Sequence, residues 1–91
     1  MPNDITVRDA TRADVDTLAR FNQRLAEETE DKTLDAETVR RGVEAVFDDP
    51  DRGFYLVAER EGHIAGSLMV TSEWSDWRNG AFWWLQSVYV R

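Results

Sequence analysis

The chain has 91 residues, of which 42% are hydrophobic and 32% charged, and it contains no cysteine. This length allows one modest hydrophobic core, and the composition is that of a globular domain rather than a disordered or membrane-embedded one. The net charge of -7 argues against a broad surface for nucleic acid or an anionic membrane, and the lack of cysteine excludes disulfides and thiolate metal sites. Because the N-terminus also lacks the features of a signal peptide, we expect a cytoplasmic protein with a single domain over residues 1–91.

The first elements of the chain are predicted to be a strand and a helix. Ile5 and Val7 alternate with polar neighbours, which is typical of a short strand with one buried face. Thr11 and Asp14 then have the spacing of a capping box at the start of a helix. Apolar residues at helical spacing follow, so we expect a helix from about Arg12 to Glu28 with one face turned inward.

A second helix is predicted after the acidic segment that follows the first. Asp35 is a good N-cap, Pro50 ends the helix, and its apolar stripe consists of Val39, Val43, Val46 and Phe47. Residues 1–50 hold 13 of the 18 acidic side chains and 7 of the 11 basic ones, so the helical half has an acidic surface. That surface either keeps the protein in solution or attracts a cationic substrate.

The rest of the chain is predicted to be β-structure. The apolar runs 54–58 and 64–71 flank a polar turn with Gly62 and should form a hairpin, while Gly66 inside the second run indicates a bulge or a close approach of backbones. The last strand covers residues 82–90. The order β-α-α-β-β-β predicts an α+β fold with a mixed, mostly antiparallel sheet and two helices.

This order resembles the N-terminal half of the GNAT-superfamily N-acetyltransferases. Three local sequences are similar to that half: ITVRDAT at 5–11 to its first strand, GFYLVAEREGHIAG at 53–66 to its second and third strands, and LQSVYVR at 85–91 to its fourth. In the family an R/Q-x-x-G-x-G/A loop after the fourth strand holds the pyrophosphate of coenzyme A, and the 91 residues do not contain this motif. The resemblance therefore implies an incomplete GNAT (acyl-CoA N-acyltransferase) fold, which we expect to be inactive alone.

The resemblance also implies where acetyl-CoA would bind. In the family, backbone groups at the end of the fourth strand polarise the acetyl carbonyl and contact the pantetheine arm. The matching positions in this chain are Val88, Tyr89 and Val90. Ordinary core or edge residues would also have these side chains, and the two roles are compatible.

The proton acceptor is less evident from the sequence. Many family members have a glutamate on the fourth strand, where this chain has Gln86, which can orient an amine or a water but is not a good base. Glu28 and Glu30 are candidates instead, because the segment between the two helices usually borders the acceptor pocket in the family. The alternative is that both are exposed acids of a polar turn.

Two interpretations of the WSDWRNG segment, residues 74–80, remain open. In the first, indoles and carboxylates enclose the cationic acceptor amine, and the residues involved are Glu73, Trp74, Asp76 and Trp77. In the second, the segment is a hairpin connection in which Trp77 packs on Trp83 or Trp84, Asp76 pairs with Arg78, and Asn79 and Gly80 form the turn. His63 is the only histidine, so no metal site is expected.

The predicted function is acetyl transfer from acetyl-CoA to a primary amine of a small molecule, by direct attack without a covalent enzyme intermediate. We expect a homodimer, because an apolar last strand at a sheet edge favours pairing. The alternative function is a non-catalytic interaction module that pairs through residues 82–90.

Overall fold

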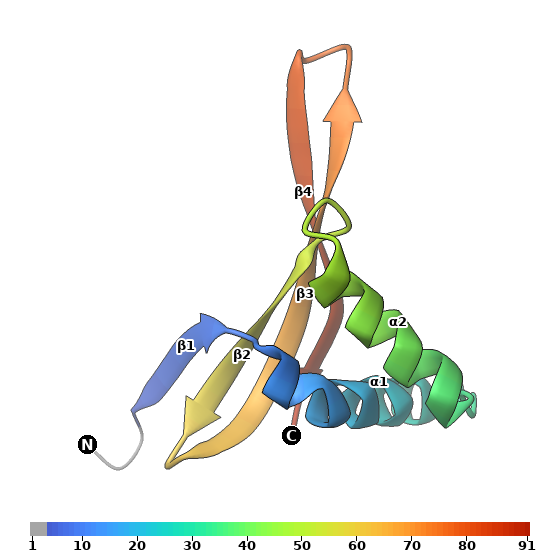
Figure 1. Ribbon diagram of the computed structural model, residues 1–91, viewed down its shortest axis with the longest axis vertical. Coiled ribbons are helices and arrows are strands. Elements are labelled where there is room, and N and C mark those ends of the chain that lie inside the picture. The colour runs from blue at the N-terminus through green and yellow to red at the C-terminus, as the bar shows by residue number, and fades with distance from the viewer. Residues whose placement is uncertain (1–3) are drawn as a thin grey trace.

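The computed structural model describes residues 4–91. Its elements follow the predicted order: β1 (Ile5–Asp9), a 3-10 turn (Arg12–Asp14), α1 (Val15–Glu30), α2 (Ala36–Asp48), β2 (Phe54–Arg60), β3 (His63–Ser75) and β4 (Gly80–Val90). The strands form one sheet in the order β1-β2-β3-β4, and each neighbouring pair is antiparallel (Figure 1). In this part of the chain no helix has the length and apolar character needed to cross a membrane.

Local hydrogen bonds set the start of the 3-10 turn that leads into α1 and the start of α2. The Thr11 amide donates to Asp14 Oδ2 at 2.8 Å, as the capping-box spacing predicts. At the second helix the Thr38 amide donates to Asp35 Oδ2 at 2.9 Å, and hydrogen bonds from Thr38 lower the pKa of the Asp35 carboxyl. Helix α1 runs two residues farther than predicted, to Glu30.

The hydrophobic core lies between the two helices and one face of the sheet (Figure 1). Tyr55 and Val57 point from β2 toward the helices, and the side chains buried with them are Val15, Leu18, Ala19 and Val43. Leu18 and Phe21 of α1 are both 1% exposed. Burying such a side chain contributes about 1.5–3 kcal/mol to the stability of the fold. These two side chains therefore hold α1 against the sheet.

The other face of the sheet has no helix over it in the part of the chain described. Side chains alternate along a strand, so this face presents exposed apolar residues from β1, β2 and β4: Ile5, Val7, Phe54, Trp83, Leu85, Val88 and Val90. The prediction that Ile5 and Val7 are buried is therefore wrong: they are 60% and 64% exposed. The strand itself forms, but Arg8 on its other face is the residue that points toward the helices and binds Asp14.

The hairpin of β3 and β4 extends well beyond the rest of the sheet (Figure 1). The 74–80 segment is a hairpin connection, with Ser75 paired to Gly80 and a turn over residues 76–79. Two details of that second interpretation are wrong. Trp77 is 95% exposed at the turn and packs on neither tryptophan, and Arg78 lies over the Phe82 ring, 5.0 Å from its centroid, rather than pairing with Asp76.

Candidate functional site

A β-bulge interrupts the pairing of β3 with the edge strand β4. Met69 pairs with Gln86 and Ser67 with Tyr89, so β4 carries one residue more than β3 across this stretch. Ser87 adopts a left-handed conformation there, with φ 51°, which is uncommon for a residue other than glycine. Bulges of this kind redirect side chains and release backbone groups from the ladder, so the site is built around this irregularity.

Beyond the bulge, β4 is the edge strand of the sheet, and some of its backbone groups point away from β3. The Arg91 amide donates to the Ala65 carbonyl at 2.8 Å, so Arg91 points its backbone groups toward β3. Because these directions alternate along an antiparallel strand, Tyr89 also points toward β3, whereas Val88 and Val90 direct their N–H and C=O groups away from it. In the sheet formed by residues 4–91 these groups have no neighbouring strand.

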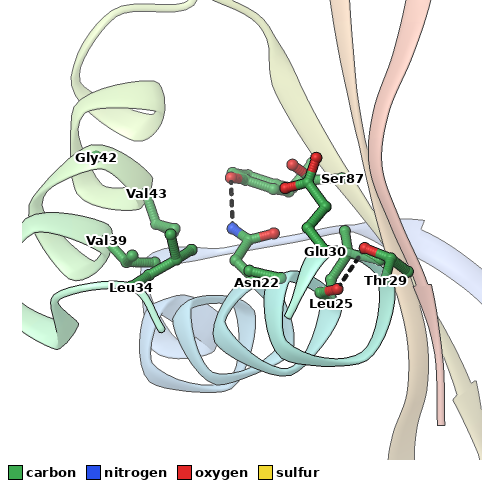
Figure 2. Close-up of a pocket in the computed structure, with 11 residues that line it drawn as sticks. Asn22, Leu25, Thr29, Glu30, Leu34, Val39, Gly42, Val43 and Ser87 are labelled. Carbon is green, nitrogen blue, oxygen red and sulfur yellow. Dashed lines mark hydrogen bonds between the residues drawn. The ribbon is translucent and has the colours of Figure 1, made fainter. Parts of the chain in front are cut away.

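A cavity of about 480 Å³ lies between α1, α2 and the bulge. Figure 2 shows Leu34, Val39 and Val43 along one side and Asn22, Glu30 and Ser87 along the other. The remaining lining residues are Leu25, Ala26, Thr29, Gly42 and Tyr55. One wall is thus apolar, and the wall toward β4 carries hydroxyl, amide and carboxylate groups.

Tyr55 and Asn22 form the polar floor of this cavity, and sequence analysis did not assign them a role. Tyr55 is 5% exposed, and Asn22 Nδ2 donates to its hydroxyl oxygen at 3.5 Å. Burial raises the pKa of the Tyr55 hydroxyl, so it remains protonated at neutral pH and keeps a proton to donate. The available signal was Asn22 itself, a polar residue within the apolar stripe of α1.

The two candidate bases are placed differently. Glu30 lines the cavity together with Ser87, whereas the Glu28 carboxylate accepts a hydrogen bond of 2.7 Å from the Tyr89 hydroxyl. That bond raises the pKa of Tyr89, whose ring packs on Phe21 with the centroids 5.0 Å apart. Glu28 therefore holds α1 against the end of β4.

Gln86 lies one residue before the bulge, on the face of the sheet that carries the helices. Its Nε2 donates to Thr71 Oγ1 at 2.6 Å across the two strands. Its amide is thus held by β3, and Ser87 rather than Gln86 borders the cavity.

The hairpin tip holds a second cavity, of about 430 Å³. It brings together the residues expected to bind an amine, and its lining consists of Glu73, Trp74, Ser75, Asp76, Trp77, Phe82 and Trp84. Trp84 Nε1 donates to Glu73 Oε2 at 2.8 Å. No residue lines both this cavity and the one at the bulge, and Trp84, which lines the tip cavity, lies three residues before Ser87 along β4. The two cavities are therefore separate sites for a small ligand.

Within residues 4–91 no group of three or more histidine, aspartate or glutamate side chains is arranged to hold a metal ion.

Comparison with solved structures shows which proteins share this fold. The chain superposes on a possible acetyltransferase from Clostridium difficile 630 with a TM-score of 0.89 and 48% identity, covering 94% of this chain and 57% of that one. A predicted acetyltransferase with acetyl-CoA from Clostridium acetobutylicum gives a TM-score of 0.78 at 16% identity, over 97% of this chain and 60% of that one. A GCN5-related N-acetyltransferase from Ralstonia eutropha JMP134 gives 0.70 at 15% identity, over 96% and 62%.

The chain therefore spans a little more than half the length of the structures it matches. No protein-family model matches the sequence, and a search among curated proteins finds no match.

Proposed function

Because this chain forms the N-terminal part of the GNAT fold, we propose that it works within a complete N-acetyltransferase domain that acetylates a small primary amine with acetyl-CoA. The observation that carries the proposal is the position of Ser87. This residue belongs to the β4 bulge and also lines the cavity that contains Glu30. The β4 bulge and a carboxylate thus border the same cavity, and Val88, the first residue with open backbone groups, follows Ser87 directly.

The end of β4 fits an acyl thioester through its backbone. Val88 and Val90 leave donors and acceptors on the open edge, and their apolar side chains need supply no polar contact. A backbone N–H aimed at the acetyl oxygen would stabilise the negative charge that develops there during attack. Acetyl-CoA supplies the acetyl group on a thiol leaving group.

The chain's own residues then prepare the amine. An alkylammonium has a pKa near that of lysine, about 10.4, so it must lose a proton before its nitrogen can attack. Glu30 would hold the ammonium in the cavity and accept that proton, directly or through water. The C–N bond forms as the C–S bond breaks, and the departing thiolate takes up a proton, so no covalent enzyme intermediate is required.

The proposal is tested by replacing Glu30 and measuring thiol release from acetyl-CoA in the protein with its complete domain. Glu30→Gln should lower kcat about 100-fold, the range of general-base catalysis, with the KM for acetyl-CoA unchanged within about twofold. Glu27→Gln is the matched control, because Glu27 is exposed on the same helix and does not line the cavity. Equal rates for the two variants, or turnover only with peptide N-termini or protein lysines, would refute the assignment.

The open edge of β4 supports a second candidate function, a non-catalytic module that pairs with a partner strand. Residues 80–90 leave one side of the strand without a neighbour among the described residues, and Trp83 and Leu85 on it are 71% and 65% exposed. Such an edge is a template for strand addition. Binding of a partner by a protein that acetylates none of the amines tested would favour this candidate.

A further inference from the structure

We infer that the cavity between α1 and α2 takes a primary monoamine with an apolar body and no anionic group. The inference names the substrate class of the site described above and so rests on the proposed function. Its basis is the distribution of apolar, charged and hydrogen-bonding groups over the cavity wall.

One side of the cavity offers only hydrocarbon. Val39 and Val43 come from α2 and Leu34 from the segment just before it, and they lie together on one side of the cavity (Figure 2). Leu25 and Ala26 of α1 add further apolar lining. Polar atoms placed against this side would lose their hydration without gaining a hydrogen bond, which disfavours binding. A sugar ring, with hydroxyls all round, does not suit it, whereas an alkyl or aryl group does.

The charge of the cavity lining also restricts which ligands fit. Glu30 is the one acidic side chain among the eleven lining residues, and none of them is lysine, arginine or histidine. A single ammonium is therefore paired with Glu30, and the lining offers no second carboxylate for the other ammonium of a polyamine. A phosphate or carboxylate on the ligand would find no cation and would meet Glu30, so phosphorylated sugars and amino acids are disfavoured.

The polar floor accommodates the ammonium end. The Asn22 side-chain carbonyl and the Tyr55 and Ser87 hydroxyl oxygens can accept hydrogen bonds from an NH₃⁺ group. The cavity volume of about 480 Å³ lies within the range of about 300–1,000 Å³ typical of small-molecule sites. An amine with one aromatic ring or a branched alkyl chain suits these dimensions.

Gly42 provides a test that changes the cavity without disturbing the fold. A Cβ added there meets no heavy atom within 4 Å, and the residue lies inside α2, where leucine is a better helix former than glycine. Gly42→Leu should therefore fold and reduce the room beside Val39 and Val43. Arg41→Leu is the control, because Arg41 is the neighbouring exposed residue and does not line the cavity.

The assay compares phenethylamine and ethylamine as acceptors. Gly42→Leu should raise the KM for phenethylamine at least about 10-fold and that for ethylamine less than about threefold, since only the larger amine needs the filled space. Arg41→Leu should change neither. An equal effect of Gly42→Leu on both amines would overturn the inference.

A panel of amines separates failure of this inference from failure of the proposed function. Higher kcat/KM for spermidine, glutamate or glucosamine 6-phosphate than for phenethylamine would overturn the inference and leave acetyl transfer standing. If no amine is acetylated, the proposed function fails, and the inference is decided by titrating the chain with phenethylamine. Shifts of the Val39 and Val43 methyl resonances that Gly42→Leu abolishes would support it, and unchanged methyl resonances would refute it.

Discussion

Replacing Asp14 tests how the start of α1 is fixed to the sheet. Asp14 is 7% exposed and accepts four hydrogen bonds, from Arg8 Nη1 at 2.8 Å, Arg8 Nη2 at 3.1 Å, the Thr11 amide at 2.8 Å and Thr11 Oγ1 at 3.5 Å. The bonds to Arg8 lower the pKa of the Asp14 carboxyl. Asp14→Asn keeps the size of the side chain and removes its charge.

The expected cost follows from what remains after the substitution. The asparagine oxygen can keep only part of the acceptor role, and its NH₂ group faces the Arg8 donors. Loss of a cap bond costs about 1 kcal/mol and loss of a charge-assisted pair about 1.5–3 kcal/mol. The second figure is reduced because the Arg8 side chain is 35% exposed and still binds Glu59. We therefore expect a loss of about 2–3 kcal/mol, or roughly 10–20 °C in Tm for a domain of this size.

The loss should also depend on pH. Because the pKa of Asp14 is lower in the folded state, its ionised form contributes fully above the pKa of the unfolded chain, about 3.9. The contribution is lost as the pH falls through the lower folded-state value. The difference in free energy of unfolding between wild type and Asp14→Asn should thus be constant near neutral pH and shrink below about pH 4.

Urea unfolding followed by tryptophan fluorescence measures both effects. Asp48→Asn is the matched control, since Asp48 also pairs with an arginine, Arg12, at 2.7 Å, but the two side chains are 60% and 62% exposed. The control should lose no more than about 0.5 kcal/mol. The reasoning is refuted if Asp14→Asn matches the control, or if its loss is undiminished in acid.

Three further outcomes are expected. Gly53→Ala should lower the free energy of unfolding in urea by more than about 2 kcal/mol, because Gly53 has φ +143° and a Cβ would lie 2.4 Å from the Val70 carbonyl oxygen. Gly62→Ala should lower it by about 1 kcal/mol, because Gly62 has φ +80° but a Cβ there meets open space. Trp77→Ala should leave the KM for the acceptor amine within about twofold of the wild-type value, whereas a rise of about 10-fold would place the amine at the hairpin tip. Light scattering after size exclusion should find the isolated chain as a dimer or larger, and Leu85→Lys should shift it toward monomer; a monodisperse wild-type monomer would contradict this.

Much of the fold could be predicted because its signals are local. The Asp35 cap, the break at Pro50 and the glycine turn before His63 act within a few residues, so the order and approximate limits of the elements follow from the sequence. Gly66 also met its expectation: the β2–β3 register shifts beside it, and a Cβ there would lie 3.0 Å from the Tyr89 carbonyl oxygen. The resemblance of local segments to GNAT enzymes agreed with the fold found.

The sequence by itself thus determined which segments are helices and strands, while the tertiary structure decided which surfaces meet. Alternation marks Ile5 and Val7 as one face of a strand but does not say that the helices cover the other face. Likewise the cavity joins Asn22, Glu30, Tyr55 and Ser87 from three elements far apart along the chain. Their proximity depends on how α1 packs on the sheet and where β4 bulges, which are interactions between distant residues that no local pattern encodes.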